Sequence, residues 1–280
     1  MIDTSELEKL VSKAMDDRPK PLSKLGYFCK PFRPDTGPFQ DKVIKIYNGQ
    51  AQGDDVSRLC KLHDEYVNLL RKLDVAFPET EIVAVESGGK QIPVIIQSAI
   101  PEKYMMRAQM LGCDVQEALE LMDAAGATIA KFWNNLTPDM GRVGFHPSIR
   151  NFAVIDKEAI FFDSFPPLLH YTHSEIGEIL LMFSESALIR FIGPLFPSKL
   201  ASIQDEWYSP SETVIGLVGS ACRLRPEDNQ HFLKWGREFA TKKMPCFAED
   251  IERGLSEPPK LPKYWTRFRK ILGLEGAPNL

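Results

Sequence analysis

Long apolar runs and paired cysteines are both missing from this sequence. No stretch reaches the roughly 18 uninterrupted apolar residues that a membrane-spanning helix needs, and the charged N-terminus does not resemble a signal peptide. The five cysteines are scattered and include no CxxC pair of the kind that begins a zinc or redox motif. We therefore expect a cytoplasmic protein with free thiols and no transmembrane segment.

Strong charge and clustered metal ligands are scarce too. The formal net charge is −4, which provides no overall attraction to nucleic acid, and we expect no nucleic-acid partner. His170 and His173 are three residues apart but have no third ligand at a plausible spacing, so we expect ordinary histidines there. What the chain does contain is 44% hydrophobic and 26% charged residues, a composition typical of a folded globular protein.

The hydrophobic patterning predicts an α+β protein in which most strands precede most helices. Apolar residues recur at helical spacing in some segments and form short β-branched runs around turn residues in others. The predicted elements are a helix over 3–17, two strands and a turn over 22–47, a helix over 54–73, a hairpin around 87–89, a helix over 115–136, a hairpin around 156–158, and helices over 174–192, 211–222 and 227–242.

Four polar residues fall at informative places on these elements. Lys45 lies inside the apolar strand VIKIY, and Glu65 follows twenty residues later in the middle of a predicted helix. Asn151 precedes Asp163 by twelve residues, with the second hairpin between them. Taken singly, each has an ordinary alternative, such as an exposed lysine, a solvated glutamate or a turn-forming aspartate. Together, in this order, they resemble the protein kinase and aminoglycoside-phosphotransferase superfamily.

This resemblance implies a two-lobed kinase-like fold. Residues 1–98 would form a nucleotide-binding lobe with a small antiparallel sheet and one main helix, and residues 99–280 a mainly helical lobe. The resemblance also implies ATP and Mg²⁺ as cofactors. Lys45 and Glu65 would pair and orient the phosphates, while Asn151 and Asp163 would hold the metal ion. Gln97 and Ala99 fall in the linker whose backbone meets the adenine edge.

Two features depart from the family pattern. The position five residues before Asn151, where the family has its catalytic aspartate, is occupied by His146. Histidine has an ordinary pKa of about 6.5 and accepts protons near neutral pH, so His146 is the candidate catalytic residue. The glycine-rich phosphate loop is reduced to Gly26 ahead of a proline-rich stretch.

The sequence therefore favours an ATP-dependent phosphotransferase that acts on a small molecule, because the second lobe has no A-P-E signature. The alternative is a pseudokinase, a scaffold or regulator that binds a protein partner with or without nucleotide. Another adenylate or phosphate chemistry using a histidine is a third possibility. The basic, aromatic stretch 261–274 is expected to pack on the body of the protein, with binding to a membrane surface or partner as the alternative.

Overall fold

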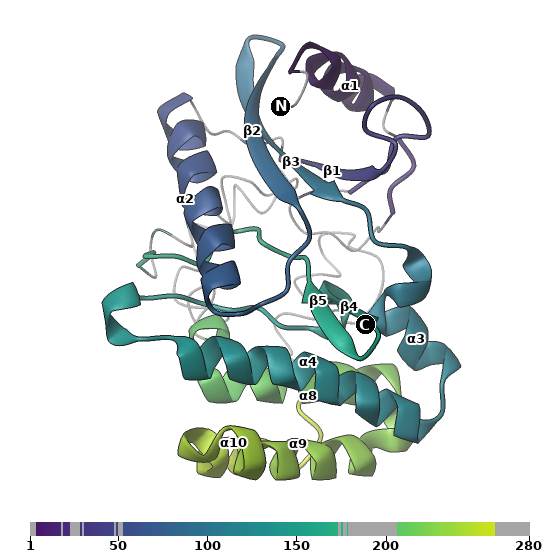
Figure 1. Ribbon diagram of the computed structural model, residues 1–280, viewed down its shortest axis with the longest axis vertical. Helices are drawn as coiled ribbons and strands as arrows, with labels where there is room; N and C mark the ends of the chain where they lie inside the picture. The colour runs from purple at the N-terminus through teal and green to yellow at the C-terminus, as the bar shows by residue number, and fades with distance from the viewer. Residues whose placement is uncertain are drawn as a thin grey trace.

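The computed structural model is an α+β protein whose helices and strands occupy different regions (Figure 1). It describes residues 4–17, 19–22, 29, 31–47, 49, 53–172, 175, 178 and 206–260. The helices are α1 (Thr4–Asp17), α2 (Gly53–Lys72), α3 (Met106–Gly112), α4 (Val115–Asn135), α8 (Pro210–Leu224), α9 (Asn229–Lys243) and α10 (Ala248–Gly254). The strands are β1 (Lys42–Ile46), β2 (Thr80–Ser87), β3 (Lys90–Ser98), β4 (Phe152–Ile155) and β5 (Glu158–Phe161).

Strands β1, β3 and β2 form an antiparallel sheet in that spatial order. The hairpin between β2 and β3 turns at Gly88 and Gly89, whose φ angles of 59° and 73° belong to the left-handed region that glycine adopts without strain. Helix α1 covers one face of this sheet, where Leu7 and Val11 share a buried cluster with Ile44. The central strand β3 is therefore buried on both faces along most of its length.

Side chains along β1 alternate between the two faces of the sheet, and this alternation determines which of them lie on the face away from α1. Because Ile44 points toward α1, its neighbour Lys45 points to the opposite side. Tyr47, two residues further on, lies on that side too, in a small buried cluster with Ile95 and Phe165. Lys45 is paired with Ile95 in the sheet register, so its side chain emerges beside this cluster.

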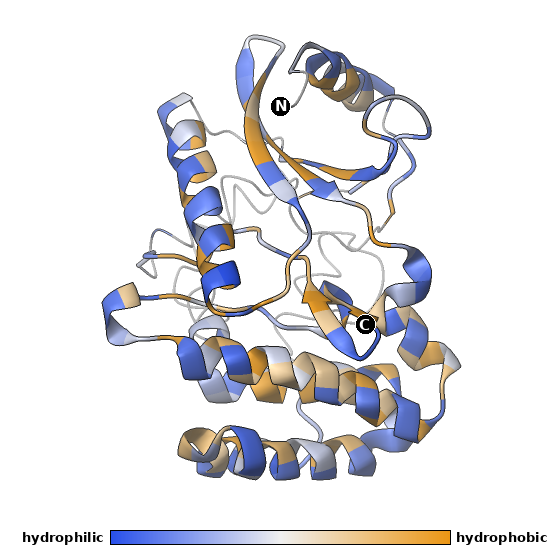
Figure 2. Ribbon diagram, viewed as in Figure 1, coloured by the Kyte–Doolittle hydropathy of each residue, from blue (hydrophilic) through white to orange (hydrophobic). Residues whose placement is uncertain are grey.

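Helix α2 is amphipathic and connects the sheet to the largest core. Asp54 and Asp55 occupy its first turn, where carboxylates interact favourably with the helix dipole. In Figure 2 the helix has a hydrophilic side and a hydrophobic side. Its later buried residues, Tyr66 and Leu70, belong to the same cluster as residues of α4, α8 and α9. Residues on both sides of position 98 thus share one core, and the division into two lobes stays a prediction.

Helix α4 lies at the centre of the helical region. Asp114 and Glu117 form a reciprocal capping box at its N-terminus, with Glu117 N donating to Asp114 at 2.9 Å. Gly126 allows close packing, since a Cβ atom there would lie 2.9 Å from Phe239 and 3.0 Å from Trp235 of α9. The hairpin β4–β5 packs on α4 from the side that faces the sheet.

Most of the predicted elements are confirmed. The helices predicted over 3–17, 54–73, 115–136, 211–222 and 227–242 correspond to α1, α2, α4, α8 and α9, and both hairpins are present. The turn predicted at Gly37 is also present, with Gln40 N donating to the Gly37 carbonyl. Most of the strand predicted after residue 22, the helix over 174–192 and the stretch 261–274 lie outside the described residues. The short helix α3 was not predicted, and α10 lies in a region expected to be helical but was given no range of its own.

Two further expectations, about the cysteines and about membrane-spanning helices, can also be compared with the structure. None of the five cysteines, all of which the structure describes, is part of a disulfide. Within the described part of the chain, none of the helices combines the length and apolar character that crossing a membrane requires.

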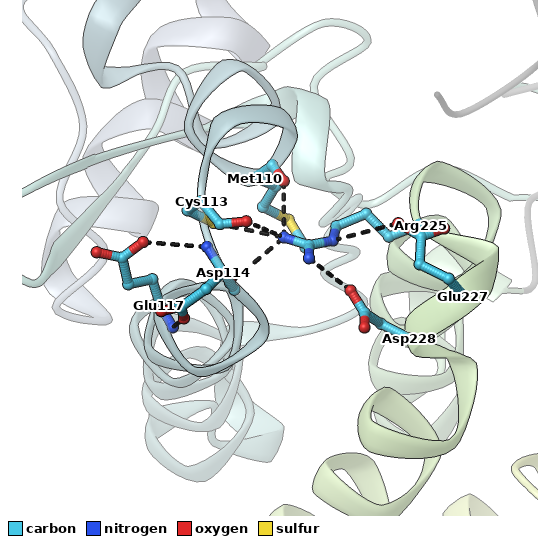
Figure 3. A network of polar contacts seen from close by, with 7 residues as sticks. All are labelled: Met110, Cys113, Asp114, Glu117, Arg225, Glu227 and Asp228. Atoms are coloured by element: carbon cyan, nitrogen blue, oxygen red, sulfur yellow. Dashed lines mark hydrogen bonds and ion pairs between the residues drawn. The ribbon is translucent and has the colours of Figure 1, made fainter.

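Arg225, at the end of α8, connects three parts of the helical region (Figure 3). Its guanidinium donates to the carbonyl oxygens of Met110 and Cys113 at 3.0 and 2.8 Å, which closes the turn between α3 and α4. It also forms an ion pair with Asp228 at 2.6 Å, and both side chains are close to nine-tenths buried. A charge removed from water in this way is stabilising only while all its partners remain.

Replacing this arginine is therefore expected to destabilise the protein strongly. Arg225→Ala leaves the Asp228 carboxylate and two carbonyls buried without their donor, and such a loss costs about 3–5 kcal/mol of unfolding free energy. Arg253→Ala is the matched control, because Arg253 is exposed and its ion pairs lie at the surface. That variant should change stability by about 0.5 kcal/mol or less. Urea unfolding of both variants measures the difference, and equal midpoints would contradict the role of Arg225.

Candidate functional site

The candidate site is organised around five consecutive residues, Phe161–Phe165, which we call the junction segment. They run from the last residue of β5 into the following loop, and residues from the sheet and from α2 contact them. The contacts are Phe161 N to the Ala76 carbonyl at 2.9 Å, Lys45 Nζ to the Phe162 carbonyl at 3.0 Å, His63 Nε2 to Ser164 Oγ at 2.7 Å, and the stacked rings of Phe165 and Tyr47 at 3.7 Å.

Lys45 is the most unusual residue in this arrangement. It is only 8% exposed, and its ammonium group donates to the backbone carbonyl of Phe162. Among the described residues it has no carboxylate within ion-pair distance. A buried ammonium held by one neutral acceptor is poorly compensated for its loss of water. The site is therefore electrostatically suited to receive an anion.

The predicted pair between Lys45 and Glu65 is not formed in this structure. Glu65 lies on the exposed side of α2 and forms an ion pair with Lys61 at 3.9 Å. The reason is the helix phase: His63 and Tyr66 are buried toward the junction segment, and Glu65 is rotated by about 200° from His63. The position on α2 that faces the site is occupied by a histidine instead of a carboxylate.

Asn151 closes the loop that carries His146. Its side-chain Nδ2 donates to the His146 carbonyl at 3.0 Å, and its backbone N–H donates to the Ser148 carbonyl at 2.8 Å. The Asn151 carbonyl in turn accepts from Phe162 N at 3.1 Å. This last bond places Asn151 next to the junction segment, one residue before Asp163. The structure thus brings together Lys45, Asn151 and the backbone at Asp163.

His146 lies in the loop closed by Asn151, and its side chain is partly buried. Its ring packs against that of Trp207, with centroids 4.7 Å apart. Burial lowers the pKa of His146 below its ordinary value, while the nearby negative charge of Asp163 acts in the opposite direction and Arg150 reinforces the lowering. The imidazole is therefore neutral at pH 7, and a neutral imidazole can accept a proton.

The Asp163 carboxylate acts electrostatically on neighbouring groups of the site. Its charge raises the pKa of both Tyr47 and Tyr66, although burial is the larger cause for each tyrosine. Within the described ranges, no group donates a hydrogen bond to the Asp163 carboxylate, and none donates to the side-chain oxygen of Asn151. The Asp163 carboxylate and the Asn151 side-chain oxygen are of the kind that Mg²⁺ prefers as ligands. Both therefore remain available to accept a metal ion.

The two predicted linker residues are already engaged within the sheet. Gln97 is buried, and its Nε2 donates to Thr80 Oγ1 at 3.0 Å. The backbone N–H of Ala99 donates to the Asp41 carbonyl at 2.9 Å. Neither donor can bind an adenine edge without giving up this partner. Any adenine contact made by this segment would have to use its other backbone groups.

Two further features lie away from the candidate site. A cleft of about 510 Å³ is lined by Pro19, Lys20, Pro21, Leu22, Arg33, Pro34, Asp35 and Gln40, and it includes none of the predicted site residues. Among the residues that the structure describes, no three histidine, cysteine or acidic side chains come together as a metal site. His170 is one isolated histidine at the surface, whereas His173 and Gly26 lie outside the described residues.

Sequence reasoning missed His63, Ser164 and Tyr47. The available signal was the position of His63 on the apolar stripe of α2, between Leu59 and Tyr66. A polar residue at an otherwise apolar helical position needs a buried partner, and the sequence does not reveal which one. Ser164 is fully buried and supplies that partner.

A comparison with protein families places the chain in one of them. The model of a family described as "Family of unknown function (DUF6206)" matches residues 6–276, so the chain belongs to this family. The match spans the sheet, the junction segment and the helical region together. None of the curated proteins matches the chain.

The lowered pKa of His146 predicts a specific loss of stability in acid. Below the ordinary histidine pKa of about 6.5 the unfolded chain takes up a proton that the folded protein resists, so protonation favours unfolding. His146→Asn should therefore lose less unfolding free energy than the parent protein between about pH 7.5 and 5.5. His231→Asn, at an exposed position of α9, should behave like the parent. Urea unfolding across this range checks the difference, and parallel curves for all three proteins would refute it.

Proposed function

We propose that the protein is an ATP-dependent phosphotransferase with a two-lobed kinase-like fold, acting on a small molecule. The observation that carries this proposal is the buried Lys45 ammonium, held 3.0 Å from the carbonyl of the residue before Asp163. A lysine between a sheet and a metal-binding aspartate is the arrangement that receives nucleotide phosphates in this superfamily. Phosphate oxygens would supply the negative charge that Lys45 lacks in the protein.

The order and packing of the elements support the same proposal. A small antiparallel sheet with one long helix comes first in the chain, and a region dominated by α4, α8 and α9 follows. The hairpin β4–β5 stands between them and ends in the junction segment. Residues 1–98 and 99–280 would then be the two lobes, joined through the buried end of α2.

The residues present are suited to one Mg²⁺ ion bound together with the nucleotide. Asp163 and Asn151 would be its protein ligands, since both offer side-chain oxygens that accept nothing from the described residues. Mg²⁺ in nucleotide sites is bound by one or two protein groups together with phosphates and water, so a cluster of three acidic residues is not required. When bound, the ion neutralises charge on the phosphates.

His146 would take the place of the family's catalytic aspartate. Its neutral imidazole, in a loop closed by Asn151, would accept the proton that the acceptor loses as it attacks the terminal phosphoryl group. Its contact with Trp207 fixes the ring plane on one side. A base that is already neutral at pH 7 needs no carboxylate to receive this proton.

A pseudokinase that binds a protein partner is the second candidate. Two observations favour it: a histidine replaces the catalytic aspartate, and Glu65 pairs with Lys61 at the surface instead of with Lys45. In that case the site would bind nucleotide without transferring phosphate, or would bind none. Binding and turnover must therefore be measured separately.

Nucleotide binding is tested by thermal unfolding with ATP, with and without Mg²⁺. Ligand at about 100 times its dissociation constant adds roughly 2.7 kcal/mol, a shift of several degrees. Lys45→Met removes the ammonium while keeping the length of the side chain and should abolish the shift. Asp163→Asn should remove its dependence on Mg²⁺.

Glu65→Gln provides the matched control for this experiment. The structure places Glu65 on the solvent side of α2, so this variant should bind Mg·ATP as the parent does. Loss of binding in Glu65→Gln would restore the predicted pair with Lys45. Absence of any shift in the parent protein would reject the nucleotide site altogether.

Turnover distinguishes the phosphotransferase from the pseudokinase. His146→Asn should reduce phosphate transfer by about 10²–10⁴-fold, the usual effect of removing a general base, with nucleotide affinity nearly unchanged. Transfer is followed by screening small-molecule acceptors for consumption of ATP above the background hydrolysis. Unchanged turnover in His146→Asn would remove this residue from the mechanism, and nucleotide binding without any transfer would favour the pseudokinase.

A further inference from the structure

The buried face of α2 contributes a side chain to the candidate site where sequence reasoning expected a glutamate. His63 is fully buried, and its Nε2 lies 2.7 Å from the hydroxyl of Ser164, which is also fully buried. Ser164 directly follows Asp163 in the junction segment. Within the described residues this is the hydrogen bond by which an α2 side chain holds that segment.

The neighbouring contacts show what this hydrogen bond controls. On one side of Asp163 the carbonyl of Phe162 accepts from Lys45, and on the other side Ser164 is held by His63. The backbone carrying the Asp163 carboxylate is therefore fixed at both flanking residues, once from β1 and once from α2. Phe165, next along the chain, is held by its stacked contact with Tyr47.

The surroundings of His63 favour a neutral imidazole at this buried position. Burial is the main cause that lowers its pKa, and the positive charge of Lys45 acts in the same direction, while Asp64 opposes both. The Nδ1 atom is buried and has no hydrogen-bond partner in the described structure, at 4.0 Å from the nearest Asp64 oxygen. Ser164 is thus the partner that accounts for a histidine at this buried position.

We infer that His63 is a positioning residue for the nucleotide site proposed above, acting through Ser164 to hold Asp163 beside Lys45. The inference rests on the proposed function for its consequence, which is nucleotide affinity, but the hydrogen bond itself exists without ligand. In the kinase-like pattern, a glutamate paired with the lysine joins this helix to the nucleotide site. His63 would make the corresponding connection from α2. It does so through the segment carrying Asp163 instead of through the lysine.

The test uses three substitutions of the full chain. His63→Leu removes the polar side chain and keeps a similar volume, and Ser164→Ala removes the other partner with the smallest change in shape. His63→Gln keeps a group that can donate or accept a hydrogen bond at a similar reach. His231→Leu makes the same change as the first variant at an exposed position of α9 and serves as the control.

The first readout is the dissociation constant of Mg·ATP, measured at a temperature where every variant is folded. His63→Leu and Ser164→Ala should each weaken binding by about tenfold, the effect of one buried hydrogen bond. The double variant should be no weaker than either single one, because both remove the same bond. His63→Gln should recover most of the affinity. A parent protein that binds Mg·ATP together with an unchanged affinity in His63→Leu and Ser164→Ala would overturn the inference.

The second readout requires no nucleotide. It distinguishes a failure of the positioning role of His63 from a failure of the proposed nucleotide binding. Hydrogen exchange of the ligand-free protein should become faster in peptides covering residues 161–165 in His63→Leu and Ser164→Ala, with α9 unchanged as an internal reference. If the parent binds no Mg·ATP, the proposed function fails, and faster exchange confined to this segment still supports the positioning by His63. Exchange equal to that of the parent in both variants would reject the positioning role, whatever the nucleotide does.

Discussion

The hydrogen bond from Lys45 to the Phe162 carbonyl is the interaction on which the candidate site depends. It joins Lys45 of β1 to the residue that follows β5, 117 residues further along the chain. The contacts of Ser164 and Phe165 extend the same connection to α2 and to the end of β1. A stretch of five residues thereby holds the sheet, α2 and the β4–β5 hairpin in one fixed arrangement.

The energetics of this connection differ from those of a purely apolar contact. A structural connection through buried apolar groups, such as the Tyr47–Phe165 stack, is favourable without further partners. A buried ammonium is different, because one carbonyl does not replace all the water that it has lost. An anionic ligand such as the nucleotide proposed above would recover this loss on binding.

The sequence allowed the elements to be predicted well, because local rules determine them. Helix α4 was expected over 115–136 and spans Val115–Asn135, since both its apolar spacing and its capping box are written in neighbouring residues. The two hairpins followed from short apolar runs around turn residues, and the structure shows positive φ angles at Gly88, Gly89, Asp156 and Lys157. Such features need no knowledge of what packs against them.

The error at Glu65 shows where local rules stop. Residues 63, 65 and 66 all lie within one turn of α2, so sequence spacing alone cannot say which of them faces β1. That choice depends on how the whole helix rotates to bury Val56, Leu59, Tyr66 and Leu70, which is a property of the assembled core. The same limit applies to Ser164, whose partner lies 101 residues away.

Two differences from the kinase-like pattern, at Glu65 and at His146, have one electrostatic consequence in common. A glutamate beside Lys45 and an aspartate at position 146 would each add a negative charge to the site, and here both are absent. What remains is the Lys45 ammonium, the Asp163 carboxylate and His146, whose pKa is lowered by burial and further by Arg150. The site therefore holds fewer negative charges than the kinase-like pattern would give it. A triphosphate would meet less repulsion here than in a site with three carboxylates, so less of its charge would have to be neutralised by metal ions. Asn151 and Asp163, the two ligands proposed above for Mg²⁺, would meet this smaller requirement, and replacing His146 by aspartate would increase it.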